Sequence, residues 1–247
     1  MRAVRWLPTV LLVCLVPPAL AASQGGCTLG TDGDDTIVCS RYDDVHPGDG
    51  GRDYVRGNEG DDVLNGGSGA DRIFGGLGID SLSGSAGGDL LDGESGGDAL
   101  YGGSGDDELR GSAGADSLVG GDGDDHAVGG TDADHIKTGA GADGAFGGDG
   151  DDTLNGGPGS DMLAGEWDHD VIRGGYGADE LYGNSGNDLL IGGPGVDFVS
   201  GGPGDDEIDV RDGSPDRVRC GPGTDTVYVD DTDRIDRIAL DCEAILD

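Results

Sequence analysis

The sequence predicts an all-β fold in which the chain winds into a parallel β-roll, a solenoid of short strands joined by tight turns. Three observations lead to this prediction. Aspartate recurs every nine residues, glycines stand at fixed places before it, and an aliphatic residue follows two places after it. Of the 247 residues, 55 are glycine and only 4% are aromatic, so an ordinary globular core is not expected.

The aspartate period runs through most of the chain without an insertion or a deletion. Twenty consecutive aspartates keep this phase: Asp35, Asp44, Asp53, Asp62, Asp71, Asp80, Asp89, Asp98, Asp107, Asp116, Asp125, Asp134, Asp143, Asp152, Asp161, Asp170, Asp179, Asp188, Asp197 and Asp206. A disordered acidic segment would also combine high charge with few apolar residues. Such a segment would not hold one period for so long, so we reject the disordered interpretation.

Each position of the repeat has a physical role. Glycines five and two residues before the aspartate allow the positive φ angles and close backbone approach that a tight turn requires. The three residues after the aspartate have an apolar centre between outward neighbours, which is the pattern of a short strand. A clear copy is GGSGDDELR, from Gly102 to Arg110. Two units make one coil, so eighteen residues should separate stacked equivalents.

These units resemble the G-G-x-G-x-D-x-U-x nonapeptides of the RTX family, the haemolysin-type calcium-binding repeats. The resemblance covers about Gly30 to Asp209. It implies a right-handed parallel β-roll with several Ca²⁺ ions between stacked turns, Asp53 and Asp71 on one edge, and Asp62 and Asp80 on the other. Backbone carbonyls would complete each shell of hard oxygen ligands. The expected metal ligands are the twenty aspartates named above except Asp44, which is doubtful because Tyr42 and His46 replace the glycine and the aliphatic residue of its unit.

Several units depart from the pattern. Asp132 and Asp168 replace the second turn glycine, and Thr138 replaces the first. Aspartate tolerates left-handed backbone better than most residues, so these turns should survive with weaker sites. Ala127 and Ala145 shorten the inward side chain, which should thin the core locally.

The ends of the chain differ from the repeats. Residues 1–22 combine Arg2 and Arg5, an apolar run and Ala19-Leu20-Ala21, the pattern of a secretory signal peptide. We expect an N-terminal cap with degenerate repeats at 23–47, the calcium-binding roll at 48–209, and a final repeat with a C-terminal cap at 210–247. The phase slips by one residue after Asp206, because Asp216 follows at ten, and a last unit then contains Asp225.

Four cysteines remain after the signal, an even number that favours disulfides in an exported protein. Three pairings are possible. We expect Cys27 with Cys39 and Cys220 with Cys242, because a bond between the two ends of a long rod is implausible.

The charge excludes some partners. The net charge is −37, and it becomes −39 when Arg2 and Arg5 are removed with the signal, leaving 12 basic residues against 51 acids. Such a chain should repel nucleic acid and anionic membrane surfaces, attract cations, and not insert into a membrane. A protein or glycan partner is left open.

The expected function is therefore that of a secreted calcium-binding repeat protein whose roll folds and becomes rigid as multiple Ca²⁺ ions bind. One inward aliphatic residue per nine is little apolar burial to set against chain entropy, so metal binding and folding should be one event. An alternative is a calcium-stiffened cell-surface or adhesin-like spacer. A calcium-dependent enzyme is less favoured, because the sequence contains neither H-E-x-x-H nor G-x-S-x-G. We predict no enzymatic activity.

Overall fold

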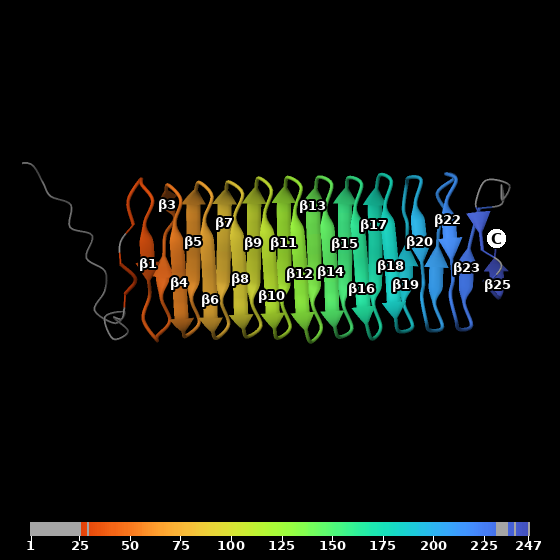
Figure 1. The fold of residues 1–247 in the computed structure, drawn as a ribbon, viewed down its shortest axis with the longest axis horizontal. Helices are drawn as coiled ribbons and strands as arrows, with labels where there is room; N and C mark the ends of the chain where they lie inside the picture. Colours follow the sequence, from red (N-terminus) through yellow and green to blue (C-terminus); the bar gives the residue numbers. More distant parts are fainter. Residues whose placement is uncertain (1–25, 29, 231–236, 240, 247) are drawn as a thin grey trace, which may run out of the picture.

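The computed structural model describes residues 26–28, 30–230, 237–239 and 241–246, and the signal-peptide prediction for 1–22 lies outside them. Within these residues the fold is an all-β parallel solenoid, which confirms the predicted fold class. Figure 1 shows the coils stacked along one axis, with the sequence running from one end to the other. No α-helix occurs in the described ranges, so none of sufficient length and hydrophobicity to cross a membrane is found there. The right-handed winding stays a prediction.

The strands form two sheets. The first sheet has 12 strands: β1 (Thr36–Val38), β4 (Tyr54–Glu59), β6 (Arg72–Leu77), β8 (Leu90–Ser95), β10 (Glu108–Ala113), β12 (His126–Thr131), β14 (Gly144–Asp149), β16 (Met162–Trp167), β18 (Glu180–Ser185), β20 (Phe198–Ser200), β22 (Arg217–Arg219) and β24 (Arg237–Ile238). The second sheet has 13 strands. Its main path contains β2 (Val45–His46), β5 (Val63–Ser68), β7 (Ser81–Ala86), β9 (Ala99–Ser104), β11 (Ser117–Asp122), β13 (His135–Ala140), β15 (Thr153–Pro158), β17 (Val171–Tyr176), β19 (Leu189–Ile191), β21 (Glu207–Asp209), β23 (Thr226–Tyr228) and β25 (Ala244–Leu246). The remaining strand, β3 (Asp49–Gly50), lies off this path and pairs with β5.

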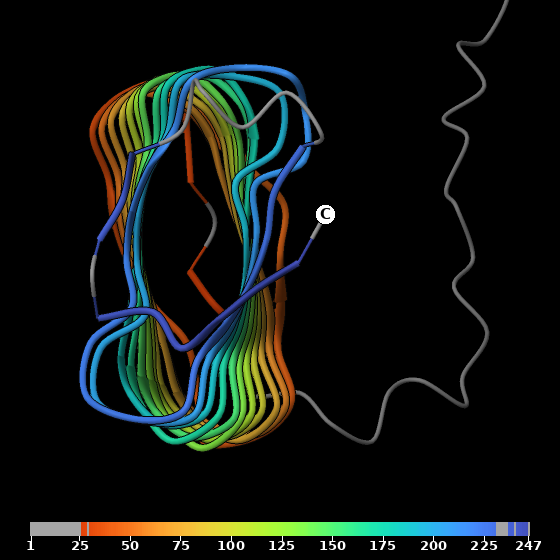
Figure 2. The same ribbon diagram turned by 90° about the vertical axis from the view of Figure 1, so that its right-hand side faces the viewer.

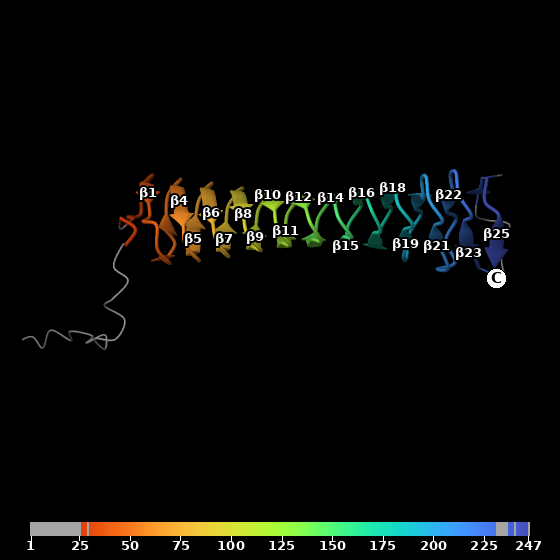
Figure 3. The same cartoon turned by 90° about the horizontal axis from the view of Figure 1, so that it is seen from below.

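From β3 onward successive strands alternate between the two sheets, and every neighbouring pair within a sheet is parallel. Leu109 of β10 pairs with Leu91 of β8 and with Ala127 of β12, so the register is eighteen residues. Figure 3 shows the chain crossing from one sheet to the other, and Figure 2 shows the oblong cross-section in which the turns superimpose at two edges. The eighteen-residue coil predicted from the repeat is confirmed.

Most strands are longer than the three residues expected from the sequence. From β4 to β18 each strand has six residues and continues through the turn glycines that follow the aliphatic residue. The glycines themselves are in register, as Gly121 and Gly139 show by pairing between β11 and β13. A glycine backbone can approach its neighbour closely enough to keep this pairing. The turn is therefore part of the sheet.

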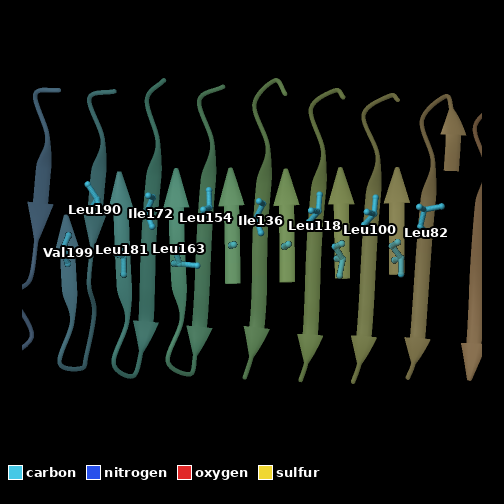
Figure 4. Packing of buried hydrophobic residues seen from close by; sticks show 14 of the residues in the cluster. Leu82, Leu100, Leu118, Ile136, Leu154, Leu163, Ile172, Leu181, Leu190 and Val199 are labelled. Carbon is cyan, nitrogen blue, oxygen red and sulfur yellow. The ribbon is translucent and has the colours of Figure 1, made fainter. Parts of the chain in front are cut away.

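The core is a double column of aliphatic side chains, one from each nine-residue unit. Figure 4 shows the side chains from the two sheets pointing into the space between them. Leu82, Leu100 and Leu118 belong to the second sheet, and Leu163 and Leu181 to the first, all fully buried.

Two alanines interrupt this column. Ala127 and Ala145 are register partners on β12 and β14, so the shortened side chains stand next to each other in the first sheet. This arrangement agrees with the locally thinner core expected from the sequence.

Both expected disulfides are present. Cys27 is bonded to Cys39 near one end of the solenoid, and Cys220 is bonded to Cys242 near the other. Cys39 and Cys220 are buried in the same cluster as the aliphatic column, so each disulfide joins the core to an end segment. A disulfide stabilises chiefly by restricting the unfolded chain.

Replacing one core leucine tests how much this thin core contributes to the stability of the folded protein. Leu118→Ala removes a fully buried side chain from β11 and should lower the free energy of unfolding in calcium by about 2–5 kcal/mol. Val119→Ala, the neighbouring change on the outer face, should alter it by about 0.5 kcal/mol. Denaturant unfolding followed by circular dichroism measures both values, and equal losses would contradict this account of the core.

Candidate metal centre

The repeating aspartates form two buried rows along the edges of the roll. The first row precedes the strands of the first sheet and contains Asp35, Asp53, Asp71, Asp89, Asp107, Asp125, Asp143, Asp161, Asp179, Asp197 and Asp216. The second row precedes the strands of the second sheet and contains Asp44, Asp62, Asp80, Asp98, Asp116, Asp134, Asp152, Asp170, Asp188, Asp206 and Asp225. All except Asp35 are at most 4% exposed. Carboxylates are rarely buried so completely unless they are paired or hold a metal.

One oxygen of each carboxylate joins neighbouring coils. The backbone N–H of Asp89 donates to Oδ1 of Asp107 at 2.8 Å, and the N–H of Asp107 donates to Oδ1 of Asp125 at 2.9 Å. The same bond recurs along both rows at 2.7–3.0 Å. We call this series of hydrogen bonds the Oδ1 ladder, and it aligns each aspartate with the equivalent aspartate of the next coil.

The second oxygen, Oδ2, has no such partner. It is buried without a hydrogen bond, within the part of the chain that the structure describes, in every repeat aspartate from Asp53 to Asp206 and in Asp225. An unsatisfied buried carboxylate oxygen carries a large desolvation penalty. A regular series of such atoms is the arrangement expected of a protein that satisfies them with cations.

Backbone carbonyls lie close to these orphan oxygens. A Cβ placed on Gly102 would come 2.3 Å from Oδ2 of Asp107 and 2.7 Å from the carbonyl oxygen of Gly120, so both oxygens face one small space. Gly57 has the same surroundings, formed by Asp62 and the carbonyl of Gly75. Carboxylate and carbonyl oxygens are the hard ligands that Ca²⁺ prefers. The residues therefore fit a calcium ion.

The turn glycines keep this space open for two reasons. From Asp62 to Asp206, the glycine five residues before the aspartate would collide with its carboxylate if it carried a side chain, and only Asp143 has another residue, Thr138, at that place. The glycines two residues before the aspartate adopt positive φ in most units, as Gly69 does at +130°, where a Cβ would come 1.5 Å from the carbonyl oxygen of Gly51. Asp132 and Asp168 also adopt positive φ, so these turns keep their shape, as the sequence predicted.

The pKa values of the buried carboxyls are raised in both rows. From Asp62 to Asp206 burial is the largest effect and raises the pKa of the repeat carboxyls, the Oδ1 hydrogen bond opposes it, and in most of them nearby aspartates raise the pKa further. The pKa is raised to about 7 for Asp98, Asp107, Asp134, Asp170 and Asp206, and to about 6 for Asp62, Asp89, Asp116, Asp125, Asp152, Asp161 and Asp197. Protons thus compete for the same oxygens.

The first two aspartates differ from the rest. Oδ2 of Asp35 accepts from the backbone N–H of Thr31 at 2.6 Å and from its hydroxyl at 2.8 Å. Oδ2 of Asp44 accepts in the same way from Ser40, at 2.8 and 2.9 Å. The protein itself therefore satisfies the oxygen that is orphaned further along. The sequence signal for this difference is the hydroxyl residue four places before each of these two aspartates, which the nine-residue pattern does not include.

Thr138 modifies one turn inside the roll. Its side chain is fully buried, and its hydroxyl donates to the carbonyl oxygen of Gly156 at 3.0 Å. Burial raises the pKa of Asp143, and the nearby Thr138 side chain lowers it less strongly. Thr138 thus places a side chain in the space that glycine leaves open elsewhere.

The Oδ1 ladder continues past Asp206, where the nine-residue period is broken. Asp216 and Asp225 are at most 1% exposed, and their Oδ1 atoms accept from the N–H groups of Asp197 and Asp206 at 2.8 and 2.9 Å. These bonds span nineteen residues instead of eighteen, so the inserted residue bulges in the loop after β21 while the ladder continues. Glu243 then accepts from the N–H of Asp225 at 2.9 Å and ends the second row.

Among the residues that the structure describes, three other groups of residues that could suggest a metal or cofactor form no comparable site. Cys27, Cys39 and Asp44 lie close together, but the two cysteines are bonded to each other. His126 and His135 belong to β12 and β13, which lie in different sheets. The G-x-G-x-x-G match at Gly139–Gly144 spans the end of β13 and the start of β14 instead of leading into a helix, so it is not a dinucleotide-binding turn.

Comparison with known proteins agrees with this geometry. The family model for the RTX calcium-binding nonapeptide repeat matches residues 47–82, 74–109, 83–118, 119–148, 138–172, 146–181 and 173–208. No curated protein matches the chain. The matched segments cover 47–208 continuously, and these are the coils that carry the orphan oxygens. The chain belongs to the RTX family of calcium-binding nonapeptide repeat proteins.

Proposed function

We propose that this chain is a secreted calcium-binding protein whose β-roll folds and becomes rigid as several Ca²⁺ ions bind between adjacent coils. The observation that carries this proposal is the series of buried, unpartnered Oδ2 atoms, which repeats in register along both edges. RTX repeat proteins are commonly extracellular, and the two disulfides indicate an oxidising environment. Family members act mainly as structural modules, and we propose no enzymatic activity for this chain.

In the folded roll the protein residues hold the ligands of each site in position. The Oδ1 ladder fixes the carboxylate in position, and the glycine backbone brings a carbonyl oxygen beside Oδ2. A bound calcium ion would supply the positive charge that the row lacks and would link ligands of neighbouring coils. Because the ligands lie on different coils, the free energy of binding becomes free energy of folding.

The environments of the aspartates narrow the set of proposed ligands. We assign calcium to the aspartates from Asp53 to Asp206, with a modified site at Asp143, and extend the assignment to Asp225. Asp35 and Asp44 are satisfied by Thr31 and Ser40, so we propose that these two turns fold without metal.

A calcium titration tests the function directly. The metal-free chain should give a spectrum with little regular structure, and Ca²⁺ at millimolar concentration or below should convert it cooperatively to a β-rich spectrum. Mg²⁺ at the same concentration should not, because it requires a smaller and stricter shell of ligands. Far-ultraviolet circular dichroism follows the change. A protein that stays fully folded in strong chelator, or that takes up no calcium, would contradict the proposal.

Single substitutions test which aspartates hold the ions. Asp107→Asn removes the charge beside an orphan oxygen, so it should reduce the calcium stoichiometry measured by native mass spectrometry and raise the calcium midpoint of folding several-fold. Asp106→Asn is the matched control, because Asp106 is exposed and an amide oxygen can still accept from the N–H of Asp124. Asp44→Asn should likewise leave the stoichiometry unchanged. Loss of an ion from either control, or none from Asp107→Asn, would refute this assignment.

Lowering the pH should stabilise the folded calcium-free protein and should weaken its binding of calcium. An aspartyl pKa that is higher in the folded state than in the unfolded state favours folding at low pH, and this advantage disappears as pH rises through about 6–7. Calcium-free protein should therefore gain β structure and unfolding free energy between pH 8 and pH 5, whereas its calcium affinity should fall over the same range. Spectra and calcium titrations at several pH values measure both trends. Stability of the calcium-free form that does not change with pH would contradict the raised pKa values of the buried carboxyls, because it would mean that the folded and unfolded states bind the same number of protons.

A further inference from the structure

One histidine is buried at the N-terminal end of the roll. His126, His135 and His169 are exposed, whereas His46 is only 3% exposed. His46 occupies the inward position of β2, where most units carry an aliphatic residue. A polar ring at the end of an aliphatic column costs free energy unless its nitrogens have partners. What surrounds the two ring nitrogens therefore decides what this residue can bind.

The contact at Nδ1 determines the state of the ring. Nδ1 lies 3.3 Å from the backbone carbonyl oxygen of Asn65. A carbonyl oxygen only accepts hydrogen bonds, so Nδ1 carries the hydrogen, and in the neutral ring Nε2 keeps its lone pair. Nε2 of His46 is buried and has no hydrogen-bond partner in the part of the chain that the structure describes. Histidines that bind a metal through one nitrogen have this arrangement, because they donate the other ring N–H to a carbonyl or carboxylate oxygen.

A carboxylate faces the same space as Nε2. A Cβ placed on Gly30 would come 2.9 Å from Oδ2 of Asp49 and 3.6 Å from Nε2 of His46. Cδ1 of Ile37 lies 3.4 Å from the same point and forms an apolar wall. Nε2 and Oδ2 are not hydrogen-bonded to each other, because Nε2 has no such partner. The two polar atoms thus surround a small space that the absent side chain of Gly30 leaves open.

This pair of ligands differs chemically from the calcium rows. Calcium prefers oxygen ligands alone, whereas an imidazole nitrogen suits Zn²⁺ and related transition metals. A carboxylate oxygen is a second ligand that Zn²⁺ accepts, and it adds negative charge. We propose that Nε2 of His46 and Oδ2 of Asp49 bind a transition-metal ion of the Zn²⁺ class. The inference does not rest on the proposed calcium function, because neither residue is a proposed calcium ligand.

The position of the two ligands determines what the ion would do. His46 and Asp49 are three residues apart, at the junction of β2 and β3, so the ion would hold this turn closed. Gly30 lies beside them and follows the disulfide-bonded Cys27 by three residues. Two protein ligands are fewer than the three or four of catalytic and structural zinc sites. The ion should therefore exchange with solution and be removable by a chelator.

A Zn²⁺ titration of the folded full-length protein at pH 8 tests the site, with both disulfides intact and Ca²⁺ in large excess to saturate oxygen-only sites. Nitrogen-15 NMR of the imidazole rings reports the state of each ring nitrogen separately. One ring should show an unprotonated Nε2, and its signal should shift as about one equivalent of Zn²⁺ is added. Loss of that signal in His46→Gln assigns it. Mg²⁺ should leave the signal unchanged, because it prefers oxygen ligands.

Two further variants test the second ligand and the space beside it. Asp49→Asn removes the carboxylate charge, and Gly30→Ala places a methyl group 2.9 Å from Oδ2. Each should weaken Zn²⁺ binding at His46 about tenfold or more. Gly33→Ala is the matched control, because its Cβ would meet nothing closer than 3.8 Å. His135→Gln removes an exposed histidine and should also leave the response of His46 unchanged.

Each outcome decides the proposal. Circular dichroism first establishes which variants are folded, and if His46→Gln is not, the Asp49→Asn and Gly30→Ala variants decide. A His46 signal that does not respond to Zn²⁺, an Nε2 that is protonated in the parent protein, or binding that survives both of these variants would overturn the site. Zn²⁺ that perturbs only the exposed histidines would show surface binding and would overturn it as well. Calcium stoichiometry measured on the same samples tests the calcium proposal separately.

Discussion

The rest of the structure depends on one constraint, the burial of aspartate carboxylates one coil apart in two long rows. From Asp53 to Asp206, Oδ1 of each repeat aspartate accepts a hydrogen bond from the neighbouring coil, while Oδ2 is left inside the protein without a donor. The remaining features of the repeat follow from this arrangement. Glycines make room for the carboxylate and bring carbonyl oxygens beside it, and one aliphatic residue per unit fills the narrow space between the sheets. Without cations such a roll would concentrate like charges in a medium that screens them poorly.

This constraint explains why metal binding and architecture are difficult to separate in the molecule. The sheets supply regular hydrogen bonds between coils, but the aliphatic column is only one residue wide on each side and is reduced to alanine at Ala127 and Ala145. A larger apolar core would stabilise the coils with or without metal. Because the core is thin, our proposal assigns to calcium at the two edges a main part in stabilising the folded roll.

Much of the fold could be predicted from the sequence because the repeat is strictly periodic. A nine-residue phase determines which residues stack, so the eighteen-residue register, the inward aliphatic column and the two rows of aspartates follow directly. The inserted residue before Asp216 concealed the continuation of the ladder, since periodicity alone cannot show where a loop absorbs an extra residue. The roles of Thr31, Ser40 and Glu243 depend on single hydrogen bonds at the ends, where no period exists. The six-residue strands were missed because a glycine-rich segment is usually interpreted as a turn alone.

The two ends of the Oδ1 ladder need different hydrogen-bonding groups, donors at the first coils and an acceptor at the last. At the first coils hydroxyl and amide groups of Thr31 and Ser40 donate to carboxylates, whereas at the last coil Glu243 provides an acceptor for an N–H group. Every coil between them offers the same donors and acceptors to both neighbours. Duplication or excision of an eighteen-residue segment in the middle would therefore leave both terminal arrangements intact. Proteins of this design can vary in length during evolution by whole coils, while their termini must be inherited unchanged.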